Sequence, residues 1–233
     1  MQPTREQLQR NLRQVQQEVT EACALAGRDP NSVRIVAVTK YVDAETTRCL
    51  AELGQLDLGE NRPQQLAEKV SAINSTPIRW HMIGHLQRNK IKLVVPTCHM
   101  IHSVDSLRLL EAINEFALQS GTVAECLLEI NISGETAKHG LRADEMPSLL
   151  EAAAGIDGVK VQGLMAMSGL DSTPEESLRQ FVAVRELRDS LAEQYGEQFP
   201  LPELSMGMSG DFPQAIEAGA TLLRIGSRLF EIN

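Results

Sequence analysis

The sequence predicts an α/β protein that folds as a single (β/α)8 TIM barrel over residues 1–233, with an extra helix at its N-terminus. Eight short apolar runs alternate with segments of helical period, and the connections between them are short. The chain has 233 residues with 42% hydrophobic content, enough for one core of barrel size. An open, doubly wound sheet is the alternative topology for the same alternation.

The apolar runs have the length and composition of buried parallel strands. The first run, VRIVAVT, has six apolar or β-branched residues out of seven and stops directly before a lysine. Continuous runs of this kind are typical of strands that are covered on both faces. The expected strands are residues 33–39, 56–60, 78–83, 99–104, 124–130, 159–166, 203–206 and 221–225.

Residues that begin or end helices flank the segments between these runs. Asp43, Ser106 and Thr173 can each accept a hydrogen bond from a first-turn amide, while Gly54 and Gly121 stand where helices should end. The expected helices are residues 4–26, 43–53, 61–73, 86–94, 106–119, 144–154, 174–195 and 211–218.

Composition disfavours several classes of partner. Twenty-two Lys plus Arg against thirty-one Asp plus Glu give a net charge of −9, which disfavours nucleic acid. The N-terminus is polar and no apolar segment reaches membrane-spanning length, so we expect a cytoplasmic protein without membrane association. The four cysteines form no C-x-x-C pair, so we expect reduced thiols. His81 and His85 are four residues apart, a chelating spacing on a helix, but on an extended segment they would lie more than about 10 Å apart, so we expect no metal.

In a barrel of this type, ligands bind at the carboxyl ends of the strands. The segments SMGMSGD and RIGS follow the seventh and eighth expected strands, and they are rich in glycine and serine. Glycine lets the backbone approach a phosphate and serine hydroxyls can donate to it, so two such segments together favour a phosphate site over ordinary turns. The residues concerned are Ser205, Gly207, Ser209, Gly210, Gly226 and Ser227.

Lys40 ends the first strand, where partial desolvation favours a neutral, nucleophilic amine over the solvated ammonium usual for lysine. An amine beside a phosphate site suggests pyridoxal 5′-phosphate (PLP), held as a Schiff base on Lys40. Arg224 precedes the last turn and can only donate hydrogen bonds, so it could face an unprotonated pyridine nitrogen. The alternative for Arg224 is an internal salt bridge with Glu60 or Glu129.

Six segments in order along the chain resemble the YggS/PROSC family of pyridoxal phosphate homeostasis proteins. They are VTK at 38–40, GENR at 59–62, WHMIGHLQRNK at 80–90, GLMAM at 163–167, LSMGMSGDFPQAI at 204–216 and RIGSRLF at 224–230. The resemblance runs from about residue 5 to residue 230. It implies the alanine-racemase-type barrel of fold-type III PLP proteins, a covalently bound cofactor and a role in vitamin B6 balance without demonstrated turnover.

Taken motif by motif, the resemblance implies that Lys40 is the Schiff-base lysine and that Arg224 faces the pyridine nitrogen. It implies side chains lining the ring at Asn61, His81 and Met165. It implies a phosphate site made by backbone and hydroxyl groups of Ser205, Met206, Ser209, Gly226 and Ser227. Ser227 stands where the family often has threonine, and it keeps the hydroxyl.

The related racemases use a tyrosine from an additional domain as a second base. Here the chain ends directly after the eighth strand, and neither Tyr41 nor Tyr195 is expected at the cofactor. We therefore expect no catalytic residues and a protein that stores or delivers PLP, with PLP-dependent apo-enzymes as recipients, as a monomer or weak dimer. A slow PLP-dependent amino-acid racemase is the alternative, and a regulatory interaction protein is a third class.

Overall fold

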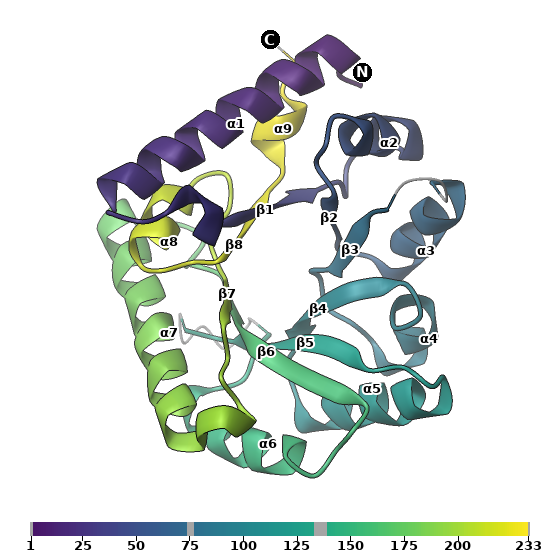
Figure 1. Cartoon of the computed structure of the whole chain (residues 1–233), viewed down its shortest axis with the longest axis vertical. Helices are drawn as coiled ribbons and strands as arrows, with labels where there is room; N and C mark the ends of the chain where they lie inside the picture. Colours follow the sequence, from purple (N-terminus) through teal and green to yellow (C-terminus); the bar gives the residue numbers. More distant parts are fainter. Residues whose placement is uncertain (1, 74–76, 133–138, 233) are drawn as a thin grey trace.

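The computed structural model describes residues 2–73, 77–132 and 139–232, and these form a closed barrel of eight parallel strands. Each strand pairs with its neighbour in chain order, and β8 pairs with β1 to close the sheet. Figure 1 shows the helices arranged around the strands. The predicted barrel is confirmed, and the open sheet is excluded. The strands are β1 (Arg34–Val38), β2 (Asp57–Glu60), β3 (Arg79–Met82), β4 (Cys98–Val104), β5 (Ala124–Ile130), β6 (Val159–Ala166), β7 (Glu203–Ser205) and β8 (Leu222–Ile225).

The helices agree with the predicted segments at most positions, and the predicted caps Asp43, Ser106 and Thr173 each accept a first-turn amide. The segment 86–94 is shorter than predicted, because a 3-10 turn at Arg88–Lys90 precedes a single α-helical turn and neither has a side-chain cap. A final helix of four residues was not predicted, since four residues are too few to show a period. The helices are α1 (Arg5–Leu25), α2 (Ala44–Glu52), α3 (Pro63–Ala72), α4 (Ile91–Val94), α5 (Leu107–Gln119), α6 (Met146–Ala153), α7 (Pro174–Tyr195), α8 (Phe212–Glu217) and α9 (Ser227–Phe230).

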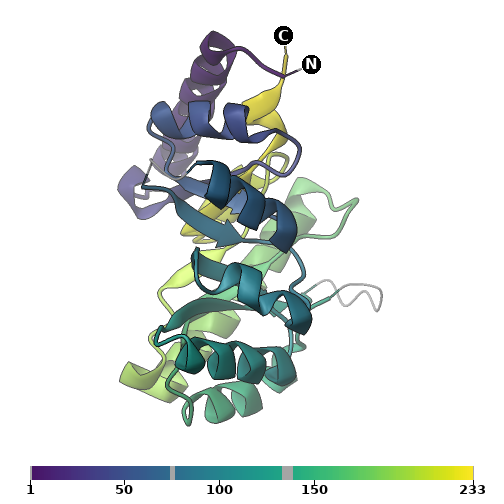
Figure 2. The same cartoon turned by 90° about the vertical axis from the view of Figure 1, so that its right-hand side faces the viewer.

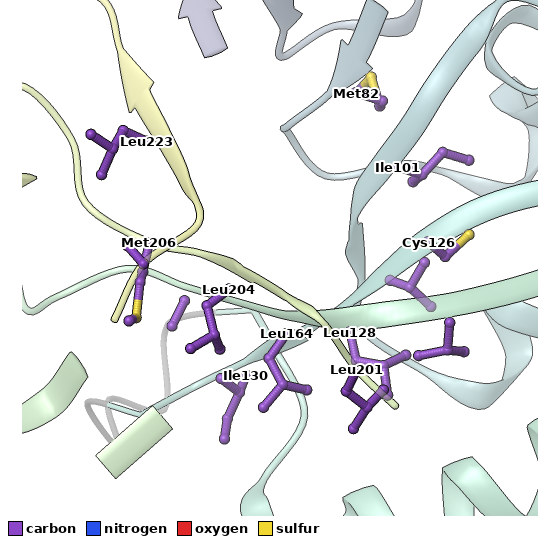
Figure 3. Packing of buried hydrophobic residues seen from close by; sticks show 14 of the residues in the cluster. Met82, Ile101, Cys126, Leu128, Ile130, Leu164, Leu201, Leu204, Met206 and Leu223 are labelled. Atoms are coloured by element: carbon purple, nitrogen blue, oxygen red, sulfur yellow. The ribbon is translucent and has the colours of Figure 1, made fainter. Parts of the chain in front are cut away.

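The buried apolar residues form two layers. The larger layer lies between the strands and the helices, and Figure 3 shows part of it, including Met206, Leu204 and Leu223. A smaller cluster, containing Val36 and Met165, is separate from it and belongs to the barrel interior. Neighbouring residues of a strand point to opposite faces, so one strand supplies both layers.

The N-terminal helix α1 packs against α8 and α9 on the outside of the barrel, and it contacts the C-terminal segment of the chain. Its apolar stripe is buried, and the Asn11 Nδ2 donates to the carbonyls of Leu229 (3.1 Å) and Glu231 (2.9 Å). Figures 1 and 2 both show the two termini close together beside this helix. No helix in the described part of the chain is both long and apolar enough to cross a membrane.

Candidate functional site

The closing pair of strands, β1 and β8, brings Lys40 next to the predicted phosphate turns. Val36 pairs with Arg224, and residues paired in a parallel ladder point to the same face of the sheet. Counting on by twos from Val36 through Val38 puts Lys40 on this interior side, just beyond the strand. Lys40 is half-buried, and its Nζ lies 4.9 Å from the centroid of the exposed Tyr41 ring.

The turns that follow β7 and β8 are joined to each other, because the amide of Gly226 donates to the Ser209 hydroxyl at 3.3 Å. Gly207 has a φ of +87°, and a Cβ built there would lie 2.4 Å from the Cβ of Ala215, so only glycine fits. Among the described residues, the backbone amides of Ser209, Gly210 and Ser227 have no hydrogen-bond acceptor. Free amides and hydroxyls gathered in one place are the donor set that a phosphate requires.

A buried chain of hydrogen bonds crosses the barrel interior and ends at Arg224. The Asp57 Oδ1 lies 3.1 Å from the His81 Nε2, and the His81 Nδ1 lies 2.9 Å from the His102 Nε2. The His102 Nδ1 lies 2.9 Å from the Ser205 Oγ, which accepts from the Arg224 Nη1 at 2.7 Å. All five side chains are buried. We call these five residues the interior relay.

The two ends of the interior relay determine the direction of every bond within it. Burial alone would raise the pKa of Asp57, but hydrogen bonds from His81 and Arg79 outweigh it and hold that pKa well below its usual value. The Asp57 carboxylate therefore only accepts, and the Arg224 guanidinium only donates. Burial lowers the pKa of both His81 and His102 and keeps them neutral. Each imidazole then donates from Nε2 and accepts at Nδ1, which is one consistent set of tautomers.

Arg224 is a buried cation without an ion pair among the described residues. Its Nη2 donates to the carbonyl of Ala166 at 2.8 Å, and burial lowers the pKa of the guanidinium to about 10. The alternative for Arg224, a salt bridge with Glu60 or Glu129, does not form. Glu60 pairs instead with the Lys69 Nζ at 2.5 Å, and Glu129 affects the pKa of Arg224 by its charge without forming an ion pair. These bonds from Nη1 to Ser205 and from Nη2 to Ala166 leave three of the five guanidinium N–H groups for a ligand.

Three residues expected to touch the cofactor have other partners. The Ser205 hydroxyl is engaged by both Arg224 and His102, so it has no free donor for a phosphate. The Met206 amide donates to Leu222, and its side chain packs in the outer layer. His81 lies inside the relay, with no exposed surface. Met165 belongs to the interior cluster and is buried, and Asn61 is half-buried just beyond the end of β2, so their contacts with the ring stay predictions.

Glu129 was not predicted as a site residue, yet it is a prominent acid at the mouth of the barrel. It lies near the end of β5, is only 5% exposed, and lines a cavity of about 470 Å³ together with Met167, Ser168 and Met208. Burial raises its pKa, and nearby Asp105 raises it further. A glutamate inside the apolar run AECLLEI was the sequence signal for it.

The chain is similar to known proteins over most of its length. The model of the family "Alanine racemase, N-terminal domain" matches residues 4–233. The pyridoxal phosphate homeostasis protein of Aquifex aeolicus is 38% identical, over 94% of this chain and 95% of its own length. The protein of the same name from Escherichia coli K12 is 33% identical, over 94% of both chains.

A solved structure is similar over nearly the same length. PipY of Synechococcus elongatus PCC7942, with PLP bound, has a TM-score of 0.82 and 32% identity, covering 91% of this chain and all of its own. The family match and the identities over most of both chains lead to one conclusion. This chain belongs to the alanine racemase N-terminal domain family and, within it, to the pyridoxal phosphate homeostasis proteins.

Proposed function

We propose that this protein binds PLP and serves intracellular PLP homeostasis as a carrier, without efficient catalysis. The observation that supports the proposal is the pairing of β1 with β8, because it brings the end of β1, just before Lys40, against the turn at Gly226 that follows Arg224. The relatives from Aquifex aeolicus and Escherichia coli are named pyridoxal phosphate homeostasis proteins, and the structure of PipY contains bound PLP. We further infer one barrel domain, a cytoplasmic location and PLP-dependent apo-enzymes as recipients.

The residues fit the chemical groups of PLP. When bound, PLP supplies an electrophilic aldehyde and an anionic phosphate. Lys40 offers the amine for covalent attachment, and the amides and hydroxyls of Ser209 and Ser227 offer donors for the phosphate. Arg224 would donate a hydrogen bond to the pyridine nitrogen, because a guanidinium has no acceptor.

The carrier role is favoured over catalysis by the surroundings of Lys40. Lys40 is only half-buried, so water is not excluded from the reacting end of a ligand. Tyr41 is 84% exposed, and the Tyr195 hydroxyl donates to the carbonyl of Pro147 at 3.1 Å. Neither tyrosine is held where it could serve as a second acid or base.

The runner-up function is a slow PLP-dependent racemase, and Glu129 favours it. A buried carboxyl group with a raised pKa at the mouth of a barrel is a suitable general acid or base. Deuterium exchange at the α-carbon of added amino acids, compared between the natural protein and Glu129→Gln, separates the two functions. Exchange that depends on Glu129 would establish catalysis, whereas its absence supports the carrier.

The binding proposal is tested by adding PLP to the cofactor-free protein and following visible absorption. We expect a new absorption band, and reduction with borohydride should leave a stable adduct on the peptide that contains Lys40. Lys40→Ala should lose both the band and the adduct, while Lys92→Ala, which changes an exposed lysine of α4, should keep them. An unchanged adduct in Lys40→Ala would mean that PLP is attached to another residue. The absence of any spectral change in the natural protein would contradict the proposal that it binds PLP.

A further inference from the structure

Two histidines and an aspartate meet at the mouth of the barrel, outside the interior relay. His85 follows β3, Asp105 follows β4, and His139 precedes α6 along the chain. The His85 Nδ1 lies 3.1 Å from the Asp105 Oδ2, and the His139 Nδ1 lies 3.9 Å from the same oxygen. One ligand atom from each residue lies within 4.8 Å of the other two. Three residues far apart in the sequence thus direct nitrogen and oxygen atoms at one point, and we call them the His–Asp–His cluster.

The separations are close to those of a metal centre. A first-row metal binds imidazole nitrogen and carboxylate oxygen at about 2.0–2.2 Å, which puts tetrahedral ligand atoms about 3.4 Å from one another. The two imidazoles are stacked, with centroids 4.4 Å apart and planes inclined by 18°. To bind the same ion, both rings must rotate until one nitrogen of each points at it. The side chains of His85 and His139 are 43% and 64% exposed, so both rings have room for this rotation.

The carboxylate of the cluster is already oriented. The Ser106 hydroxyl donates to the Asp105 Oδ1 at 3.2 Å, so the Oδ2 is the oxygen that faces both histidines. Ser106 is itself held as the N-cap of α5, and the Asp105 side chain is 14% exposed. A fixed carboxylate with a partner on its second oxygen resembles the outer hydrogen bonding of established metal sites.

The donor set selects the class of ion. Two imidazoles with one carboxylate suit Zn²⁺, Co²⁺ and related transition metals, whereas Mg²⁺ and Ca²⁺ require mainly oxygen ligands. We propose that His85, Asp105 and His139 form a binding site for one divalent transition-metal ion.

The site would lie at the edge of the mouth cavity, because His139 also lines that cavity with Glu129. Three protein ligands leave coordination positions for water or for a donor atom of a small molecule. The metal site is independent of the proposed cofactor chemistry, since none of its ligands is a residue assigned to PLP. Its test therefore uses the cofactor-free chain.

The experiment is a titration of full-length, tag-free protein that has been stripped with a chelator. Co²⁺ is followed by its ligand-field absorption in the visible range, and Zn²⁺ by calorimetry. We expect one equivalent of each ion to bind, at least tenfold more weakly in His85→Gln, His139→Gln or Asp105→Asn, and not at all in the double variant His85→Gln/His139→Gln. His99→Gln removes an imidazole outside the cluster and should bind like the natural protein.

Lys40→Ala serves as a second control and should retain full metal affinity, because Lys40 is not a metal ligand. The metal titration can therefore succeed or fail independently of PLP binding. Thermal melting of each variant shows that it is folded, and the exposure of both histidines favours this. Uptake of no ion by the natural protein would overturn the proposal. Uptake that is unchanged in the double variant, or in any one ligand variant, would overturn it as well.

Discussion

At the residue scale, Ser205 joins a buried cation to a buried imidazole, and both capacities of its hydroxyl are used. In Ser205→Ala, the Arg224 Nη1 and the His102 Nδ1 lose this partner in the barrel interior. Leaving buried polar groups unpaired costs about 1–3 kcal/mol. We expect the free energy of unfolding to fall by about this amount, measured by urea denaturation at pH 7.5.

The matched control is Ser190→Ala on the exposed side of α7. This change should alter the free energy of unfolding by less than about 0.5 kcal/mol, because the hydroxyl is solvated. Equal losses in the two variants would mean that the interior relay contributes nothing specific to stability.

At the scale of the element, the turn between β7 and α8 depends on one glycine. Gly207→Ala combines a left-handed φ of +87° with a Cβ 2.4 Å from that of Ala215, so the turn must move. We expect a loss of about 1–3 kcal/mol in the free energy of unfolding. Because this turn holds the free amides, the same variant should also bind PLP more weakly, as measured by titration.

Gly210, three residues further on, offers the control. A Cβ built there meets nothing within 4 Å, and its φ is not in the left-handed region. Gly210→Ala should therefore unfold within about 0.5 kcal/mol of the natural protein. A stable Gly207→Ala variant would show that the turn can relax without its glycine.

At the scale of the whole molecule, the neutral histidines inside the barrel predict how stability depends on pH. Burial lowers the pKa of His81 and His102, whereas in the unfolded chain both take a proton below about pH 6.5. The unfolded state then binds more protons than the folded state, so the free energy of unfolding falls as the pH falls through this range. Glu129, with a raised pKa, acts in the opposite direction.

His102→Gln isolates one histidine, because glutamine keeps a donor and an acceptor but does not titrate. The contribution of Glu129 is common to both proteins and cancels in the comparison. Between pH 7.5 and pH 5.5 the variant should lose about 1.4 kcal/mol less free energy of unfolding than the natural protein. Urea denaturation at the two pH values measures this difference. Equal losses in the two proteins would mean that His102 has the same pKa in the folded and unfolded states, and they would contradict the prediction.

Much of the fold could be predicted because its signals are local. Apolar runs, capping residues such as Asp43 and Thr173, and the glycines after the last strands each act within a few residues of their own position. The candidate residues Lys40, Ser209, Gly226 and Arg224 were identified because strand ends meet in a barrel. Each of them stands at or just beyond the end of an expected strand, so the pairing of β8 with β1 brings these segments to the same part of the barrel.

The roles of Ser205, Met206 and His81 could not be predicted in the same way. Each stands in or beside an almost continuous apolar run, where the sequence does not show which face a side chain takes. The register of β3 against β4 also shifts between Trp80 and His81, so counting along the strands does not reveal which residues meet. The structure places Ser205 and His81 in the interior and the Met206 side chain in the outer layer.

The barrel, its order of strands and the position of Lys40 at a strand end could be predicted from the sequence, because each follows from local periodicity and from the rule that the strand ends of a barrel share one face. The interior relay that ends at Arg224 and the His–Asp–His cluster at the mouth become visible in the folded chain alone. Both join side chains from different strands and loops, and such contacts depend on the register and closure of the sheet, which no single stretch of sequence contains.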